Sequence, residues 1–411
     1  MKGQALKKLR ASKVKALVIL LLFFLLLFSA PRGIAFAGEN GAKSPEEIED
    51  ELNGNIDEQL NGLDFSQFEK LIERLNSGGN ALFGGTSFGD KVRSIINGDF
   101  KIGYDSALEA ITAMAFGSIA EVMPLFATVV GIAVLSSLLN NMRSDKSKSG
   151  AIVYYACYAA VIIVVAYAVF SLVNVTKNTV NAMQEQMNVI FPVLLSFITA
   201  LGGTSSAAVY QPVAAMLSTF VSEMMTHFIL PLFIFSFVFN IIGNLSPNVK
   251  LGKFSGFIGS LSKWCIGLVF AVFSAFMTVQ GITAATYDGV SIKTARYAIS
   301  HYIPIVGGYL SEGLNLIIAG SVLIKNAVGM SALLLLAATV MAPLISVIVM
   351  SLGLKLTAAV LEPLSESGYS SFVSAAAKSL NMLIAVLLSV AFMYFITLLL
   401  IISTGNQLFV S

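Results

Sequence analysis

The chain has 411 residues, of which 56% are hydrophobic and 12% are charged, and its net charge is +2. Soluble domains carry about 25% charged residues, and several apolar runs here exceed the roughly 18 residues that cross a bilayer as a helix. The composition excludes an ordinary soluble protein and predicts an all-α, polytopic helical membrane protein. Basic residues are scattered at the ends of apolar runs, so no nucleic-acid partner is expected.

The amino terminus is typical of a secretory signal. Lysine and arginine residues precede the apolar core Ala16–Phe28, and Ala35-Phe36-Ala37 supplies a small-x-small cleavage pattern. We expect residues 1–37 to be a signal peptide, with an uncleaved membrane anchor as the alternative. Both place residue 38 onward outside the cytoplasm.

Residues 38–110 are acidic, with fifteen acidic and six basic side chains and a net charge of −9. Ser44-Pro45-Glu46-Glu47 is typical of a helix start, and apolar residues recur at helical spacing across Asp64–Leu75. The pattern predicts an acidic, partly helical exocytoplasmic segment. About seventy residues bury too little apolar surface for a sizeable core, so this segment should pack against something else.

Residues 111–411 are expected to form a multi-span helical membrane domain. The first spans lie near residues 119–141 and 151–173, and the loop between them carries basic residues, which marks it as cytoplasmic. This orientation agrees with export of the acidic segment. Cys157 and Cys265 both fall in spans and are interpreted as small buried hydrophobes in preference to a disulfide or metal pair.

The middle of the chain is ambiguous. Residues 174–186 are expected to be an outer loop, and lysines mark the loop at 244–263 as cytoplasmic, so one or three crossings must lie between them. We favour three short or broken helices across residues 187–243. His227, before Pro231, is either a gating or proton-relay group or a polar residue bonding a freed carbonyl, and Glu223 stands where it can pair with it. The freed-carbonyl interpretation is preferred.

Later spans are expected near residues 264–285, 328–350 and 380–402. Lys355 and Lys378 keep the intervening loop cytoplasmic, so the last span runs outward.

The stretch Val279–Asn326 concentrates charge in an otherwise apolar half of the chain. Asp288-Gly289 predicts a turn, an interfacial helix follows from Val290, and Pro304 interrupts it. The stretch is either a solvated loop with an interfacial helix or a re-entrant element lining an aqueous path. The candidate pore-lining or docking residues are Asp288, Lys293, Arg296, His301, Glu312 and Lys325.

No constellation of catalytic residues is apparent. The chain has no G-x-x-x-x-G-K-[ST] loop and no H-E-x-x-H pair, and it has two histidines in all. Asp288 has no second aspartate in a facing span, as an intramembrane aspartyl protease would need. We expect no enzyme activity, no cofactor and no metal site.

Three short runs give a resemblance to a known family. V-Q-G-x-x-A-A-x-x-D-G-V-x-x-K-T-A-R at 279–296, I-P-x-x-G at 303–307 and S-V-L-I-K-N at 321–326 are similar to the stage III sporulation protein AE family. The likeness covers most of residues 110–405 and is strongest over 279–330. Residues 38–100 match only in character.

This resemblance implies a membrane subunit of the sporulation channel, or feeding apparatus, that joins mother cell and forespore. It would be needed for forespore integrity and late forespore-specific sigma-factor activity, and it would sit in the mother-cell membrane around the forespore. The implied partners are other stage III sporulation membrane proteins, a forespore membrane partner, a separate secretion-type ATPase, membrane lipid, a membrane insertase and further copies of the chain (a homo-oligomer). The alternatives are an independent small-molecule permease and a non-conducting assembly scaffold.

Overall fold

The structure is a computed structural model that describes residues 45–100, 104–141, 148–201, 203–245, 251–302, 307–364 and 367–404. The chain divides into two units, Met1–Glu49 and Asp50–Ser411. Of the first unit only the start of helix α2 (Pro45–Asn61) is described, and the expected signal peptide lies outside the described residues. The account below concerns the second unit.

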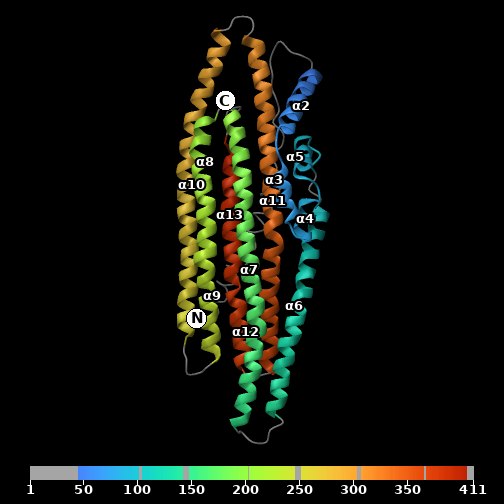
Figure 1. The fold of residues 1–411 in the computed structure, drawn as a ribbon, viewed down its shortest axis with the longest axis vertical. Helices are drawn as coiled ribbons and strands as arrows, with labels where there is room; N and C mark the ends of the chain where they lie inside the picture. Colours follow the sequence, from blue (N-terminus) through green and yellow to red (C-terminus); the bar gives the residue numbers. More distant parts are fainter. Residues whose placement is uncertain are drawn as a thin grey trace, which may run out of the picture. The chain divides into compact units, whose positions relative to one another are not determined.

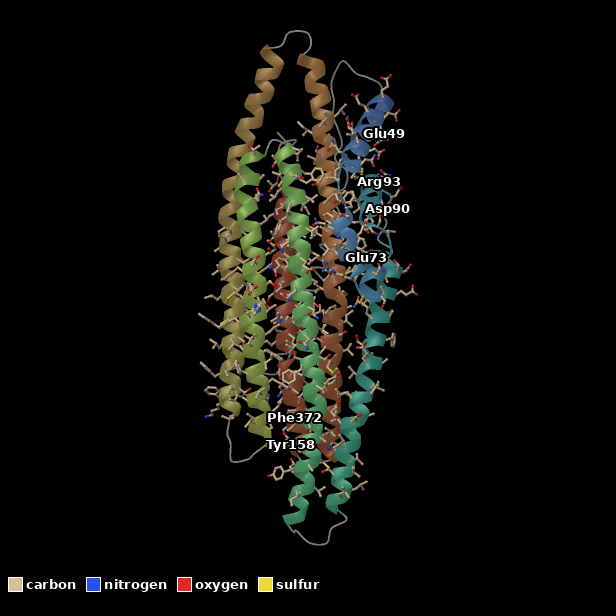
Figure 2. The ribbon with its side chains drawn as sticks, viewed as in Figure 1. Glu49, Glu73, Asp90, Arg93, Tyr158 and Phe372 are labelled. Atoms are coloured by element: carbon tan, nitrogen blue, oxygen red, sulfur yellow. The ribbon has the colours of Figure 1, made fainter. Side chains whose placement is uncertain are left out.

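Four short helices precede the membrane domain. After α2 come α3 (Ser66–Glu73), α4 (Ser77–Phe83) and α5 (Phe88–Ile96). The acidic segment is thus partly helical, as its sequence predicts. The Asn76 and Ser87 side chains cap α4 and α5 by accepting hydrogen bonds from backbone N–H groups. Figure 2 labels the charged residues Glu73, Asp90 and Arg93 in this region.

The short helices share a small aromatic core. Phe68 and Phe88 stack with ring centroids 4.1 Å apart, and Phe83 lies against the same cluster. Lys91 sits over the Phe83 and Phe100 rings at 5.4 Å, and its burial lowers the pKa of the ammonium. The core is small, so docking on the longer helices, α11 above all, supplies the remaining contacts.

Long helices form the rest of the unit and run side by side in alternating directions (Figure 1). Helix α11 packs mainly on α6, α7, α12 and α13, and α10 packs mainly on α8 and α9 but also contacts α11 and α13. In chain order they are α6 (Tyr104–Asn141), α7 (Lys148–Ala200), α8 (Thr204–Glu223), the π-helical turn η1 (Met224–Ile229), α9 (Leu230–Leu245), α10 (Gly252–Tyr302), α11 (Gly307–Leu364), α12 (Ser367–Ser379) and α13 (Asn381–Ser403).

Six stretches in the described residues are long and apolar enough to cross a membrane. They are Asp105–Leu139, Ile152–Ala200, Ser218–Asn244, Gly252–Thr278, Leu316–Pro363 and Gly368–Ser403. Large apolar side chains such as Phe116, Ile163 and Trp264 stand exposed on their outer faces, where lipid would cover them. The described residues are helical with no strand, which confirms the prediction of an all-α polytopic membrane protein.

The expected outer loop at residues 174–186 is wrong, because α7 is one continuous helix of 53 residues. Thr176, Val180, Met183 and Met187 are buried at helical spacing, so charged residues such as Lys177 and Glu185 lie on the opposite, exposed face. Window hydropathy averages these two faces and therefore suggests a loop.

The three short helices expected across residues 187–243 are likewise absent. Residues 187–200 complete α7, and α8, η1 and α9 form a single rod with one π-helical turn. Pro192 lies inside α7 and does not end it. Beyond the end of α7, one candidate span, Ser218–Asn244, covers this region.

Large side chains fill the interior between α7, α11, α12 and α13. Tyr158, Tyr369 and Phe372 form an aromatic cluster near one end (Figure 2). Tyr394, Leu387 and Leu383 are buried further along α13. The centre of the bundle is therefore packed with side chains, as in a soluble protein core.

Candidate functional site

The predicted charged stretch divides between the ends of two helices. Asp288, Lys293, Arg296 and His301 lie in the last turns of α10, and Glu312 lies in the second turn of α11. Their side chains are outside the described residues, so whether they line a pore or a docking surface stays a prediction.

The backbone corrects the expected shape of this stretch. Asp288-Gly289 does not form a turn, because α10 continues through it to Tyr302. The short apolar segment Leu314–Leu323 is not separate either, since it belongs to the 58-residue helix α11. No break within α10 or α11 separates charged from apolar parts, as a re-entrant element would need. The expected interruption at Pro304 lies outside the described residues.

Lys325 is the one predicted site residue whose side chain is described. It is fully buried, and its ammonium donates a hydrogen bond to the backbone carbonyl of Thr404, just beyond the end of α13. A cation at a helix carboxyl terminus interacts favourably with the unsatisfied carbonyls there. Lys325 therefore joins α11 to the end of α13 from inside the bundle.

Polar contacts tie the short helices to the long ones. The Arg74 guanidinium donates to the Glu185 carboxylate on α7. The Ser321 hydroxyl on α11 donates to the Gln59 side chain at 2.7 Å. Both contacts come from residues that the sequence pattern gave no reason to pair. They place the segment after Asp50 against α7 and α11, as its small core requires.

An exposed contact between an imidazole and a carboxylate marks the π-helical turn. The Nδ1 atom of His227 lies 2.7 Å from Oε2 of Glu223, and the two side chains are 65% and 58% exposed. The Thr226 hydroxyl lies 3.1 Å from the same ring nitrogen. The predicted pairing of Glu223 with His227 is confirmed. The preferred interpretation, in which His227 bonds a freed carbonyl, is not supported for Nδ1. That nitrogen contacts the Glu223 carboxylate and the Thr226 hydroxyl instead.

Pro231 gives a physical reason for the π-helical turn. Proline has no N–H, so the His227 carbonyl lacks its ordinary partner four residues on. The chain instead adopts a wider turn in which the Leu230 N–H bonds to the Met225 carbonyl, five residues back. Such single π turns are frequent at functional sites.

The described part of the chain contains no cluster of side chains suited to bind a metal ion or to carry out redox chemistry. No three His, Cys, Asp or Glu residues there stand close enough to hold a metal ion. Cys157 and Cys265 are free, the first half-buried on α7 and the second buried on α10.

Comparison with known proteins gives one family. The family model described as Stage III sporulation protein AE matches residues 86–405, so the likeness reaches further into the acidic segment than the expected residues 110–405. A relative named Stage III sporulation protein AE, from Bacillus subtilis (strain 168), is 24% identical over 313 residues, which cover 76% of this chain and 78% of the relative. No solved structure matches. The chain is therefore a multi-pass membrane protein that belongs to the stage III sporulation protein AE family.

Proposed function

We propose that the chain is a membrane subunit of the channel, or feeding apparatus, that joins mother cell and forespore during sporulation. It would sit in the mother-cell membrane around the forespore, with residues 38–110 in the space between the two membranes. In this role it supports forespore integrity and late forespore-specific sigma-factor activity. Family membership and the six candidate spans support the setting.

The length of the helices is the observation that favours this role most. Helices α10 and α11 have 51 and 58 residues, which at roughly 1.5 Å per residue is about 75 Å or more. The hydrocarbon core of a bilayer is only about 30 Å thick. Two joined helices of this length reach well outside the membrane, as a component that meets partners between two membranes would need.

The partners we propose follow from the same setting. The exocytoplasmic helices would meet other stage III sporulation membrane proteins and a forespore membrane partner. A separate secretion-type ATPase would supply energy, because the chain has no phosphate-binding loop of the G-x-x-x-x-G-K-[ST] type. We propose that the chain has no enzyme activity of its own.

A non-conducting scaffold is the second candidate, and the packed interior favours it. Residues such as Tyr394, Phe233 and Leu387 are buried within the bundle, so a single copy offers a filled core where a conduit would run. A scaffold needs the long helices for assembly but does not need their charges to face a transported solute.

The test separates the two candidates by neutralising the charged end of α10. Asp288→Asn, Lys293→Gln and Arg296→Gln are combined in one full-length chain and compared with wild type and with a deletion strain in sporulating cells. The measurements are forespore volume, a late forespore-specific reporter and the amount of protein in the mother-cell membrane.

The conducting role predicts loss of the reporter and shrinkage of the forespore with normal membrane levels of the protein. A scaffold predicts that the neutralised chain works as wild type does. A deletion strain with normal forespores and a normal reporter contradicts both roles in sporulation.

A further inference from the structure

The outward face of the α8–η1 rod carries polar groups where lipid would be expected. Thr219, Glu223 and His227 are all exposed and lie four residues apart along the rod. These three residues, called here the polar stripe, fall inside the candidate span Ser218–Asn244. Phe220 and Phe228, exposed beside them at 43% and 45%, show the apolar surface that flanks the stripe.

The other side of the rod is already occupied. Ser218, Val221, Ser222, Met225 and Ile229 are buried, and the rod contacts α7, α10 and α13. The Tyr394 hydroxyl of α13 donates to the Ser218 carbonyl at 3.0 Å. The rotation of the rod is thus set by its packing, and the polar stripe faces away from the bundle.

Exposure of this ion pair to lipid would be unfavourable. Ionisable side chains in membrane spans are costly unless they face protein, water or one another. Glu223 and His227 do pair with each other, yet each side chain remains more than half exposed in the isolated chain. A protein surface or water must therefore cover them in the membrane.

The stripe can complement a second copy of itself in polarity. It offers one carboxylate and one imidazole separated by a single helical turn. When two copies with the same membrane orientation meet across a two-fold axis, the rods are parallel. The Glu223 of each copy can then reach the His227 of the other. Thr219 in the same row, a small side chain, lets the two rods approach closely.

We propose that the polar stripe of Thr219, Glu223 and His227 is the contact face for a second copy of this chain, stripe against stripe. The inference rests on the proposed function. Because the core of a single copy is filled with side chains, a conducting assembly needs more than one copy. It names the surface through which the copies meet, and it places a network of carboxylates and imidazoles at their boundary.

Cysteine cross-linking at this face tests the contact. Two differently tagged full-length chains are made together in sporulating cells, each with Cys157→Ser and Cys265→Ala. Thr219→Cys is then introduced in both chains, and the membranes are oxidised. Phe220→Cys is the matched control, because it lies at the same depth on the same rod but about 100° around the helix axis.

The expected result is a disulfide-linked dimer that carries both tags for Thr219→Cys and little or none for Phe220→Cys. Glu223→Gln or His227→Gln in the Thr219→Cys background should lower the dimer yield about fivefold, the effect of a polar contact of ordinary strength in a membrane. Combining the two should add little to either alone, since they remove one network.

Three outcomes overturn the inference. In the first outcome, the Thr219→Cys chain runs at monomer mass. The stripe would then be covered by lipid or by another part of the same chain. An adduct of higher mass lacks the second tag, which would assign the stripe to another protein. Equal dimer yields from the two cysteine variants would mean random collision. A late forespore-specific reporter in the same strains reports the proposed function separately, so a failed cross-link with an active reporter contradicts the contact alone.

Discussion

Lys325 illustrates how a sequence position can be singled out correctly while its surroundings stay hidden. Its charge in an apolar half of the chain suggested a pore lining or docking surface, but its side chain is fully buried beside the end of α13. Hydropathy does not tell which side of a helix faces a neighbouring helix. The packing of α11 against α13 decides it here.

Lys325→Ala should destabilise the bundle, because it removes both the hydrogen bond to the Thr404 carbonyl and the packing of the aliphatic stem. We expect the free energy of unfolding to fall by about 2 kcal/mol, the range for hydrogen bonds that involve a charged group. The measurement is unfolding of the purified chain by a denaturing detergent. Lys325→Met is the control, because it keeps the stem and removes the buried charge.

Lys325→Met should lie closer to wild type than Lys325→Ala does, since an apolar side chain of similar size often replaces a buried charge at little cost. Wild-type stability of the alanine variant would show that the contact with α13 contributes nothing. Equal losses in both variants would assign the whole effect to the ammonium.

At the scale of elements, the contact between α4 and α11 depends on one glycine. A Cβ atom built on Gly79 would lie 2.6 Å from the backbone carbonyl oxygen of Ala338 on α11. A backbone oxygen cannot move aside as a side chain can. Glycine at this position therefore lets the short helices dock directly on α11.

Gly79→Ala should push α4 away from α11 at a cost of about 1–3 kcal/mol, as overpacking does elsewhere. The measurement is the rate at which an added protease cleaves the segment after Asp50 in cells with a permeabilised envelope. We expect this rate to rise. Gly78→Ala is a close control, because its added Cβ would meet the Met114 side chain, which can change rotamer. Equal cleavage of both variants would contradict a tight contact between α4 and α11.

The same scale shows what hydropathy could and could not predict. Apolar runs alone predict the spans near residues 119–141, 151–173, 264–285 and 328–350, and α6, α7, α10 and α11 contain them. The span expected at 380–402 matches α13 to within one residue. Hydropathy does not reveal that α7 is continuous. In that part of the helix exposed Lys177 and Glu185 alternate with buried Val180 and Met183. The pairing of Arg74 with Glu185 was out of reach, because nothing local relates residues 111 positions apart.

For the molecule as a whole, the direction of each helix can be derived from the six spans and the basic loops. The proposed export of the acidic segment would place the start of α6 outside, and crossing by all six candidate spans would return the end of α13 to the same side. From the basic residues around residues 142–148 and at Lys253 we expect cytoplasmic ends there for the first four long elements. One crossing or three crossings in the middle of the chain give the same final orientation, because both numbers are odd.

Both ends of residues 38–411 should therefore lie outside the cytoplasm. A phosphatase that is active only after export, fused after Ser403, should be active, and the same enzyme fused after Ser144 should be inactive. A fluorescent protein that folds only in the cytoplasm should give the opposite pattern at the two positions. Activity of the phosphatase at Ser144 would contradict the assigned orientation. Its inactivity both at Ser144 and after Ser403, with the chain intact in the membrane, would require an odd number of crossings. One of the six apolar stretches would then lie along the membrane or within the assembly, and the charged ends of α10 and α11 would have to be assigned to the other side.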